Sequence, residues 1–195
     1  MVAPIDATLP APGTGFDPGK NNTALQAHVE FFDSDNDGII WPSDTYRGCR
    51  EIKFGIFLAL FSTIVIHAGF SYLTWGSIVP DPFFRLKIRY MHKAKHGSDT
   101  ESYTKIGEFD ESRFNYTFDM YSEPPHTHLS FGEGLRMLRG NRNPWDPFGW
   151  FAAAFEALAA YLMLWPEDGR MRREDVKAIY DGSIFYAISG RKPKN

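Results

Sequence analysis

The chain has 195 residues, and 43% of them are hydrophobic, which is enough for one folded domain with a sizeable core. A formal net charge of −3 provides no basic surface for phosphates, so nucleic acid is not expected as a partner. The single cysteine, Cys49, excludes an internal disulfide and favours a reducing compartment.

Residues 1–21 are rich in Pro, Gly, Ala and Thr and show no hydrophobic periodicity, so a flexible arm is expected there. Residues 22–53 predict one EF-hand, a helix–loop–helix calcium unit. We expect its entering helix over Ala24–Phe32, its loop over Asp33–Asp44 and its leaving helix over Pro42–Lys53. Mainly helical structure is therefore predicted from the first ordered residues onward.

The loop carries oxygen donors at the positions that a calcium loop uses, namely the first, third, fifth, seventh and twelfth. A glycine at the sixth position, here Gly38, allows the sharp turn. Asp44 stands at the twelfth position where Glu is usual, and its shorter side chain predicts weaker Ca²⁺ binding or some tolerance of Mg²⁺. An acidic surface turn without metal is the alternative. The predicted ligands are Asp33, Asp35, Asp37, the carbonyl of Ile39, and Asp44.

An apolar segment with a proline break occupies residues 54–82. Phe54–Trp75 contains no Asp, Glu, Lys or Arg and approaches the ~20 residues that cross a hydrocarbon core. Pro80 and Pro82 end the segment, and the basic run that follows suits an anionic membrane surface. The pattern favours a helix or helical hairpin that lies in one leaflet, and a true span and a buried core helix are the alternatives.

Residues 83–195 predict a helical region that contains degenerate copies of the calcium unit. The copies lack the acidic ligands of the first half of the loop, and short paired strands would let them brace the intact loop; ordinary turn and helix chemistry is the alternative. A second apolar run, Phe148–Trp165, is interrupted by Glu156 and predicts a buried helix, or one that lies against a membrane beside the first segment. The three copies are GEFDESRFNYTFDMYS (107–122), HLSFGEGLRML (128–138) and EDGRMRREDV (167–176).

Three histidines are considered as ligands. His92 and His96 are four residues apart, so on a helix they would face the same side, as metal ligands do, although a solvated face has the same spacing. His28 precedes the calcium loop by five residues on the entering helix. If it binds a cofactor, calcium would set its position; a partly buried structural histidine is the alternative.

Five motifs occur in a fixed order along the chain, namely LQAHVEFFDSDNDGIIWPSDTYRG, MHKAKHGSDTESY, GEFDESRF, GNRNPWDPFGW and DGSIF. Through them the chain resembles the caleosin family from about Asn22 to Lys192. The resemblance implies a calcium-dependent haem peroxygenase that moves oxygen from a hydroperoxide to an unsaturated fatty acid or another apolar acceptor. It implies haem b and Ca²⁺ as cofactors, and it identifies His28 and His96, rather than His92, as the haem-binding and catalytic residues.

The resemblance also implies a monotopic position on the cytosolic face of a lipid droplet or the endoplasmic reticulum membrane. The partners would be a fatty acid or its hydroperoxide and the lipid surface, with oligomerisation left open. The predicted fold class is mainly α, with EF-hand-like units, small paired loop strands and an apolar membrane-associating segment. The alternative functions are a noncatalytic calcium-binding coat of lipid droplets and a calcium sensor with an apolar groove.

Overall fold

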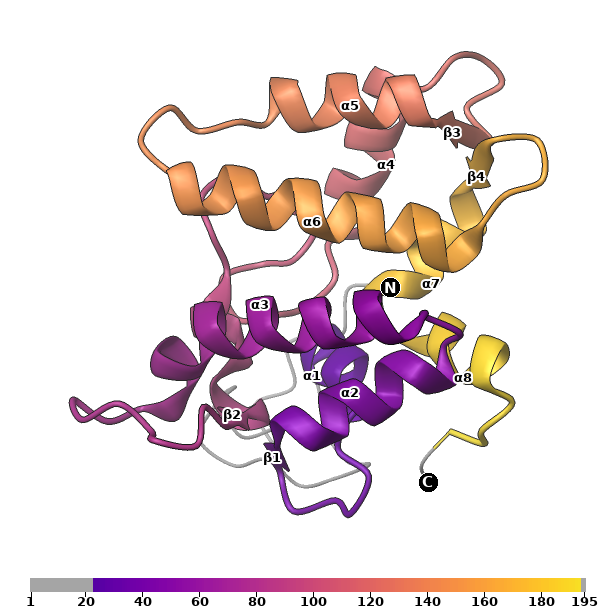
Figure 1. The fold of residues 1–195 in the computed structure, drawn as a ribbon. Coiled ribbons are helices and arrows are strands. Elements are labelled where there is room, and N and C mark those ends of the chain that lie inside the picture. The colour runs from indigo at the N-terminus through magenta and orange to yellow at the C-terminus, as the bar shows by residue number, and fades with distance from the viewer. Residues whose placement is uncertain (1–22, 194–195) are drawn as a thin grey trace, which may run out of the picture.

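The computed structural model describes residues 23–193, so the arm predicted over residues 1–21 lies outside them. The chain forms two halves, one above the other in Figure 1. The predicted mainly helical class with small strand pairs is confirmed. The first half contains α1 (Ala24–Glu30), β1 (Ile39–Ile40), α2 (Pro42–Glu51), α3 (Ile56–Trp75), β2 (Leu86–Lys87) and the 3₁₀ helix η1 (Ile88–Ala94).

The second half begins with α4 and ends with a short helix that returns to the first half. The side chain of Phe185, on that last helix, packs into the same buried cluster as Phe31 and Cys49 of the first half. Both halves are therefore joined by a shared core. The elements are α4 (Glu111–Tyr121), β3 (His128–Ser130), α5 (Phe131–Gly140), α6 (Pro147–Leu164), β4 (Arg170–Arg172), α7 (Arg173–Tyr180) and α8 (Ser183–Ser189).

The predicted calcium loop, Asp33–Asp44, pairs with a segment that has no calcium-loop motif. Strand β1 of the loop lies antiparallel to β2, with Ile40 opposite Leu86. The prediction that a degenerate copy braces this loop is therefore wrong. A partner strand needs backbone groups and an apolar side chain to pack, and Leu86 supplies these without any loop signature; it is 3% exposed.

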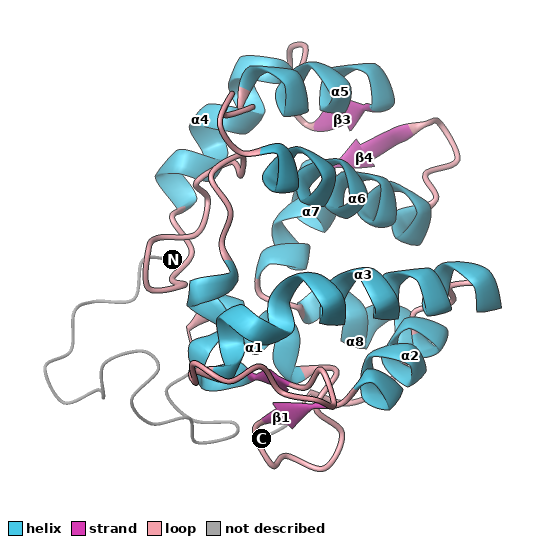
Figure 2. Cartoon of the chain, turned by 60° about the vertical axis from the view of Figure 1, so that its left-hand side comes forward, coloured by secondary structure: helices cyan, strands magenta, loops and turns pink. Residues whose placement is uncertain are grey.

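The second and third degenerate copies pair with each other instead. Strands β3 and β4 are antiparallel, and Leu129 lies opposite Met171, the two residues at the eighth position of their copies. Figure 2 shows this strand pair between α5 and α6, far from β1. The first copy contributes only an isolated bridge between Tyr103 and Phe109. The predicted strand pairing is thus confirmed for two copies, and they build a second, self-contained helix–loop–helix pair.

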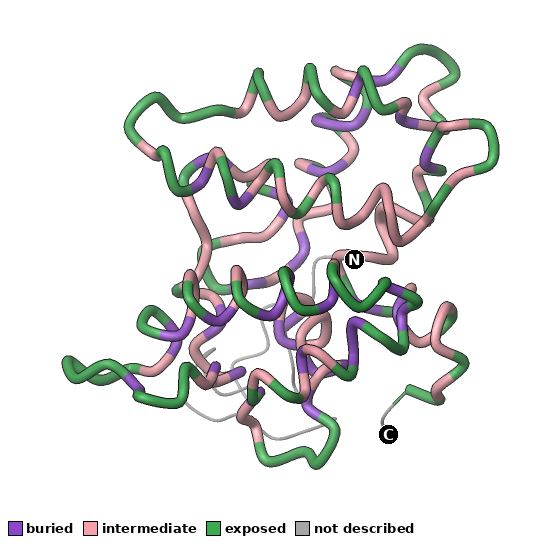
Figure 3. The backbone as a smooth tube through the Cα atoms, viewed as in Figure 1, coloured by how far each residue is buried: buried purple, intermediate pink, exposed green. Residues whose placement is uncertain are grey.

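Helix α3 has its polar and apolar faces reversed relative to an ordinary helix at a protein surface. Its buried residues are mostly polar, among them Ser62 and His67, whereas Phe57 is 89% exposed and Ile64 is 65% exposed. Figure 3 shows exposed and buried residues alternating along this helix. The alternative of a buried core helix is therefore wrong, because the apolar side chains lie outside. The helix is also single rather than a hairpin, and it ends at Gly76 in the left-handed conformation, φ 74°.

Helix α6 is not buried either. Its side chains of Phe148, Phe151 and Leu158 are exposed, so the expectation of a buried helix is wrong. Aromatic contacts join it to α3, since Phe61 meets Phe155 and Phe70 meets Phe148. Helix α6 remains exposed because it covers the second half from one side only. Within residues 23–193, two helices, α3 and α6, are long and apolar enough to cross a membrane.

Candidate functional site

Three aspartates of the loop gather at one point. The carboxylate oxygens of Asp33, Asp35 and Asp37 lie within 4.8 Å of one another, and Asp33 is buried while the other two are exposed. The turn is held by the backbone N–H of Gly38, which donates to Asp33 Oδ2 at 2.9 Å. Gly38 itself has φ 80°, a conformation that favours glycine. Clustered carboxylates of this kind are the hard oxygen donors that Ca²⁺ and Mg²⁺ prefer.

The two remaining predicted ligands lie next to this cluster along the chain. Ile39 opens β1, and its backbone N–H donates to Asp37 Oδ1 at 2.7 Å. Asp44 is not a member of the cluster. It lies in the first turn of α2, where its Oδ2 accepts the backbone N–H of Trp41 at 3.0 Å. The structure therefore brings three of the five predicted ligands together and holds the short twelfth side chain at the start of α2.

A cavity of about 400 Å³ lies between the two halves, within the range of small-molecule sites. Its walls are mainly apolar and come from α1, α3, α6, α7 and the segment after η1. His28 and His96 both line it, and His92 does not. The polar groups around them are Lys95, Ser98, Asp99, Thr100, Ser102, Tyr103, Glu156 and Tyr180.

His28 is held by the last turn of α7 and by the turn that follows it. Its Nδ1 lies 2.6 Å from the carbonyl oxygen of Ile179, and because a carbonyl only accepts, Nδ1 carries the proton. The other nitrogen, Nε2, therefore keeps its lone pair in the neutral ring. Gly182 in the same turn has φ 76°, and a Cβ there would lie 2.8 Å from the His28 Cα. The DGSIF motif thus keeps α1 and the turn in close contact around His28.

Burial determines the protonation of His28. It lowers the pKa of this imidazole from the ordinary 6.5, and it outweighs the hydrogen bond to Ile179, which raises the pKa. The ring of Phe185 also meets the imidazole edge-on, with centroids 4.9 Å apart. His28 is consequently a neutral, oriented imidazole at neutral pH, which is the form that ligates metals.

His96 has a different environment. The N–H of Ser98 donates to its Nδ1 at 3.3 Å, and its Nε2 lies 3.7 Å from Glu156 Oε2. Burial lowers the pKa of His96, but the hydrogen bond and the charge of Glu156 outweigh it, so the pKa is raised above the ordinary 6.5. His96 follows η1, which ends at Ala94, so the helical spacing between His92 and His96 does not form. His96 therefore offers a proton on Nε2 rather than a free lone pair.

Two polar residues at the cavity, Glu156 and Tyr180, lie outside the five sequence motifs. Glu156 is the charged residue that interrupts the apolar run of α6, and that interruption was the available signal. Two tyrosines, Tyr103 and Tyr180, line the cavity beside it, and burial raises the pKa of both, so both phenols stay protonated. The Tyr103 hydroxyl donates to the carbonyl of Tyr180 at 2.6 Å.

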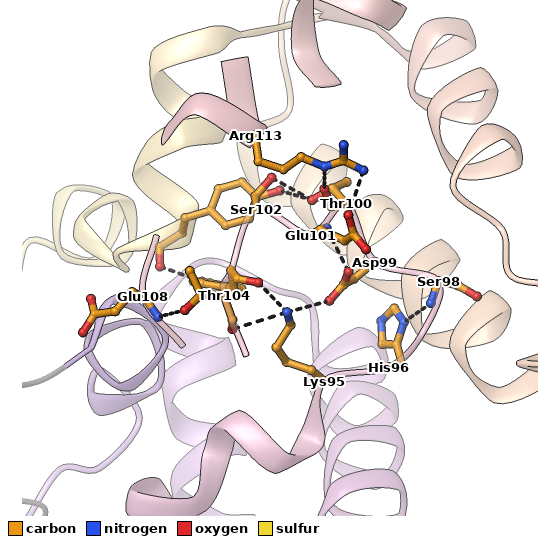
Figure 4. A network of polar contacts seen from close by, with 12 residues as sticks. Lys95, His96, Ser98, Asp99, Thr100, Glu101, Ser102, Thr104, Glu108 and Arg113 are labelled. Carbon is orange, nitrogen blue, oxygen red and sulfur yellow. Dashed lines mark hydrogen bonds and ion pairs between the residues drawn. The ribbon is translucent and has the colours of Figure 1, made fainter. Parts of the chain in front are cut away.

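Hydrogen bonds fix the segment that follows η1 (Figure 4). Lys95 donates to the carbonyl of Tyr103 and forms an ion pair with Asp99 at 3.4 Å. Thr100 Oγ1 lies 2.9 Å from Ser102 Oγ and 3.0 Å from the Tyr180 hydroxyl. The MHKAKHGSDTESY motif therefore forms a rigid polar edge that presents His96 to the cavity.

Comparison with known proteins gives one family. The sequence model described as "Caleosin related protein" matches residues 20–189. A protein named "Peroxygenase" from Lilium longiflorum is 36% identical over 184 residues, which cover 94% of this chain and 77% of the relative. "Probable peroxygenase 4" from Arabidopsis thaliana is 35% identical over 183 residues, with 92% of each chain covered.

A more distant relative carries a different name. The "Probable inactive peroxygenase-like protein" of Arabidopsis thaliana is 26% identical over 154 residues, covering 75% of this chain and 70% of the relative. No solved structure matches the chain. The similarity is therefore stronger to the two relatives named as peroxygenases.

Proposed function

Because the chain belongs to the caleosin family and is a peroxygenase, we propose that it uses a haem bound in the large cavity to oxidise unsaturated fatty acids or other apolar acceptors. The oxygen donor is a fatty acid hydroperoxide or a similar hydroperoxide. The observation that supports this most directly is that His28 and His96, which are far apart in sequence, line one apolar cavity.

His28 suits the role of iron ligand. Its Nδ1 proton is engaged by Ile179, which leaves the Nε2 lone pair, and a hydrogen bond of this kind orients ligating histidines in many metal sites. The apolar walls suit a flat, hydrophobic ligand. The donor set and the walls thus fit a haem whose iron is bound by His28.

His96 and Glu156 suit a polar role at the same cavity. A haem, when bound, supplies the oxygen-transfer chemistry. His96 holds a proton at Nε2 beside the Glu156 carboxylate, where it can donate a hydrogen bond or this proton to a peroxide. The apolar side chains of α3 and α6 exclude water from the acyl chain.

The position of His28 close to the predicted calcium loop in the chain supports calcium dependence. Helix α1 ends at Glu30 and the first aspartate of the loop, Asp33, comes three residues later. We propose that Ca²⁺ bound by the aspartate cluster stiffens the end of α1 and thereby the position of His28.

Association with a lipid droplet or a membrane is supported by the reversed helix α3. An apolar face that is exposed over most of a 20-residue helix is unfavourable in water and favourable in a lipid surface. Two basic residues after the proline break, Lys87 and Arg89, would lie at the anionic headgroups. We propose a monotopic arrangement, because the polar face of α3 is packed on protein.

A haem-binding experiment tests the proposal. The full chain is reconstituted with haem, and the absorption spectra of the wild type, H28A, H96A and H92A are compared. We expect H28A to lose the Soret band or shift it strongly, and H96A to keep the band but lose oxidation of oleate by cumene hydroperoxide. H92A is the matched control, because His92 does not line the cavity. A wild-type spectrum in H28A would contradict the ligand assignment.

A further inference from the structure

A second cavity adjoins the large one and is rimmed by positive charge. It has a volume of about 320 Å³. Three residues, Ser98, Leu138 and Ala153, line both cavities, so the two are neighbours with a common wall. The remaining lining residues are Leu135, Arg139, Arg142 and Trp150.

The two arginines at this cavity have no anionic partner within the described part of the chain. Arg139 lies in the last turn of α5 and Arg142 two residues after that helix, and both are exposed. No carboxylate of residues 23–193 forms an ion pair with either, whereas Arg136 on the same helix is 3.9 Å from Glu133. The Arg142 guanidinium lies over the Trp150 ring, 4.7 Å from its centroid, and this contact orients the guanidinium. Both arginines therefore keep their hydrogen-bond donors available.

The carboxylate next to this cavity, that of Asp146, already accepts hydrogen bonds from other groups. Asp146 Oδ1 accepts the backbone N–H of Gly149 at 2.8 Å, and its Oδ2 accepts the Ser98 hydroxyl at 3.1 Å. These bonds cap the start of α6. Both oxygens of Asp146 are thus engaged with Gly149 and Ser98, and within residues 23–193 this carboxylate forms no ion pair with either arginine.

Residues on one side of α6 extend from the arginines at the outer cavity toward His96 in the large cavity. Trp150, Ala153 and Glu156 are spaced by three residues on α6, so they lie on one side of the helix and span about 9 Å of its axis. Trp150 is at the outer cavity, Ala153 is in the common wall, and Glu156 faces His96. Apolar side chains, Leu135 and Leu138, flank the outer end of this path. Positive charge at one end and apolar walls toward the other match an amphipathic anion.

We propose that Arg139 and Arg142 bind the carboxylate of the fatty acid substrate in the outer cavity, with its acyl chain passing along Leu138 and Ala153 into the large cavity. This inference rests on the proposed function. A guanidinium donates two parallel hydrogen bonds to a carboxylate, so a pair of arginines is well suited to this group. The anchor holds the carboxylate away from His96 and directs the middle of the chain toward it.

A substrate pair that differs only in charge tests the proposal. Oxidation of oleate and of methyl oleate by cumene hydroperoxide is measured with the haem-loaded full chain in a neutral detergent, so that no anionic lipid takes part. We expect the variant R139Q/R142Q to lose about tenfold or more in kcat/KM for oleate, mainly through a higher KM, because charge-assisted hydrogen bonds are lost. Its kcat/KM for methyl oleate should stay close to the wild-type value.

A matched control separates this effect from a general loss of charge. R136Q removes one positive charge from the same helix but outside the cavity, and it should leave the oleate to methyl oleate preference unchanged. An unchanged preference in R139Q/R142Q, or an equal loss for both substrates, would overturn the proposal. The single variants R139Q and R142Q repeat the measurement if the double variant does not fold.

A binding measurement decides the anchor independently of catalysis. Laurate and dodecanol are titrated calorimetrically into the full chain of the wild type and of R139Q/R142Q. We expect the variant to bind laurate about tenfold more weakly and dodecanol equally well. Wild-type protein that oxidises neither oleate nor methyl oleate would contradict the proposed function, while the laurate titration would still support or reject the anchor.

Discussion

At the scale of single residues, Asp81 shows how one ion pair organises the chain after the proline break. Its carboxylate is 4% exposed and binds Arg85 through both oxygens, with Arg85 Nη2 to Oδ1 at 2.9 Å and Nε to Oδ2 at 3.0 Å. The guanidinium also lies 4.8 Å from the Trp41 ring and 4.4 Å from the Trp75 ring. This cluster joins the end of α3 to the chain that enters β2.

We predict that Asp81→Asn destabilises the protein in a pH-dependent manner. The hydrogen bond from Arg85 is the main cause that holds the pKa of Asp81 below its ordinary 3.8, so the ion pair contributes fully above that pH. The contribution disappears as the pH falls through the lowered pKa of the folded state. Urea unfolding should therefore show a lower midpoint for the variant at pH 7, and the two midpoints should converge below about pH 3.8. A constant difference down to pH 2 would contradict this account.

At the scale of elements, α3 and α6 have two tasks that explain their unusual surfaces. Their inward residues line the large cavity, and their outward residues are exposed and apolar. Aromatic contacts between them close the wall that separates the cavity from the outside. Lipid in contact with this wall would place an apolar substrate next to the cavity that oxidises it.

We predict that polar substitutions on the outer face of α3 weaken binding to lipid. The double variant F57S/I64S removes two exposed apolar side chains, each worth about 1.5–3 kcal/mol when buried in an apolar phase. Flotation with phospholipid-coated triolein droplets should fall by roughly tenfold or more. M120S is the matched control, because Met120 is exposed on α4, in the other half of the chain. Equal flotation of F57S/I64S and the wild type would show that α3 is not the lipid-binding surface.

At the scale of the whole molecule, the cavity depends on contacts between distant parts of the chain. His28 lies on α1, which leads into the predicted calcium loop, and it is held by the end of α7 and the turn before α8. The loop is also linked to α3, because Thr45 Oγ1, just after Asp44, lies 2.7 Å from His67 Nε2. The same imidazole bonds the carbonyl of Phe84 through Nδ1 at 2.5 Å. The calcium loop is therefore connected both to His28 and to the wall of the cavity.

We predict that removal of calcium weakens haem binding. Haem titrations followed at the Soret band should give a lower affinity with a chelator than with Ca²⁺, because the end of α1 loses its fixed position. D33A should show the low affinity in both conditions. D168A is the matched control, since Asp168 lies in a degenerate loop copy and, among the residues that the structure describes, accepts a bond only from the local backbone N–H of Arg170. The same haem affinity with and without calcium would show that calcium binding at the aspartate cluster does not affect haem binding.

The sequence by itself determined the local features of this protein. Residue spacing predicted the calcium loop, since ligand positions lie within twelve consecutive residues, and the lack of charged residues marked the apolar segment of α3 while leaving a helix or a hairpin open. The motif resemblance pointed to His28 and His96, and both line the cavity. The repeated loop pattern placed Leu129 and Met171 at the eighth position of two loop copies, but it did not predict that these copies pair with each other. All these features depend on residues that are near one another in the chain or on a recurring motif.

The tertiary structure alone decided what depends on distant contacts. The partner of β1 is Leu86 rather than a loop copy, because strand pairing is chosen by packing and carries no short motif. The different environments of His28 and His96 come from Ile179 and Glu156, which lie 151 and 60 residues further along the chain. The exposure of α3 and α6 likewise could not be read from hydropathy, because an apolar helix has the same composition whether protein or lipid covers it.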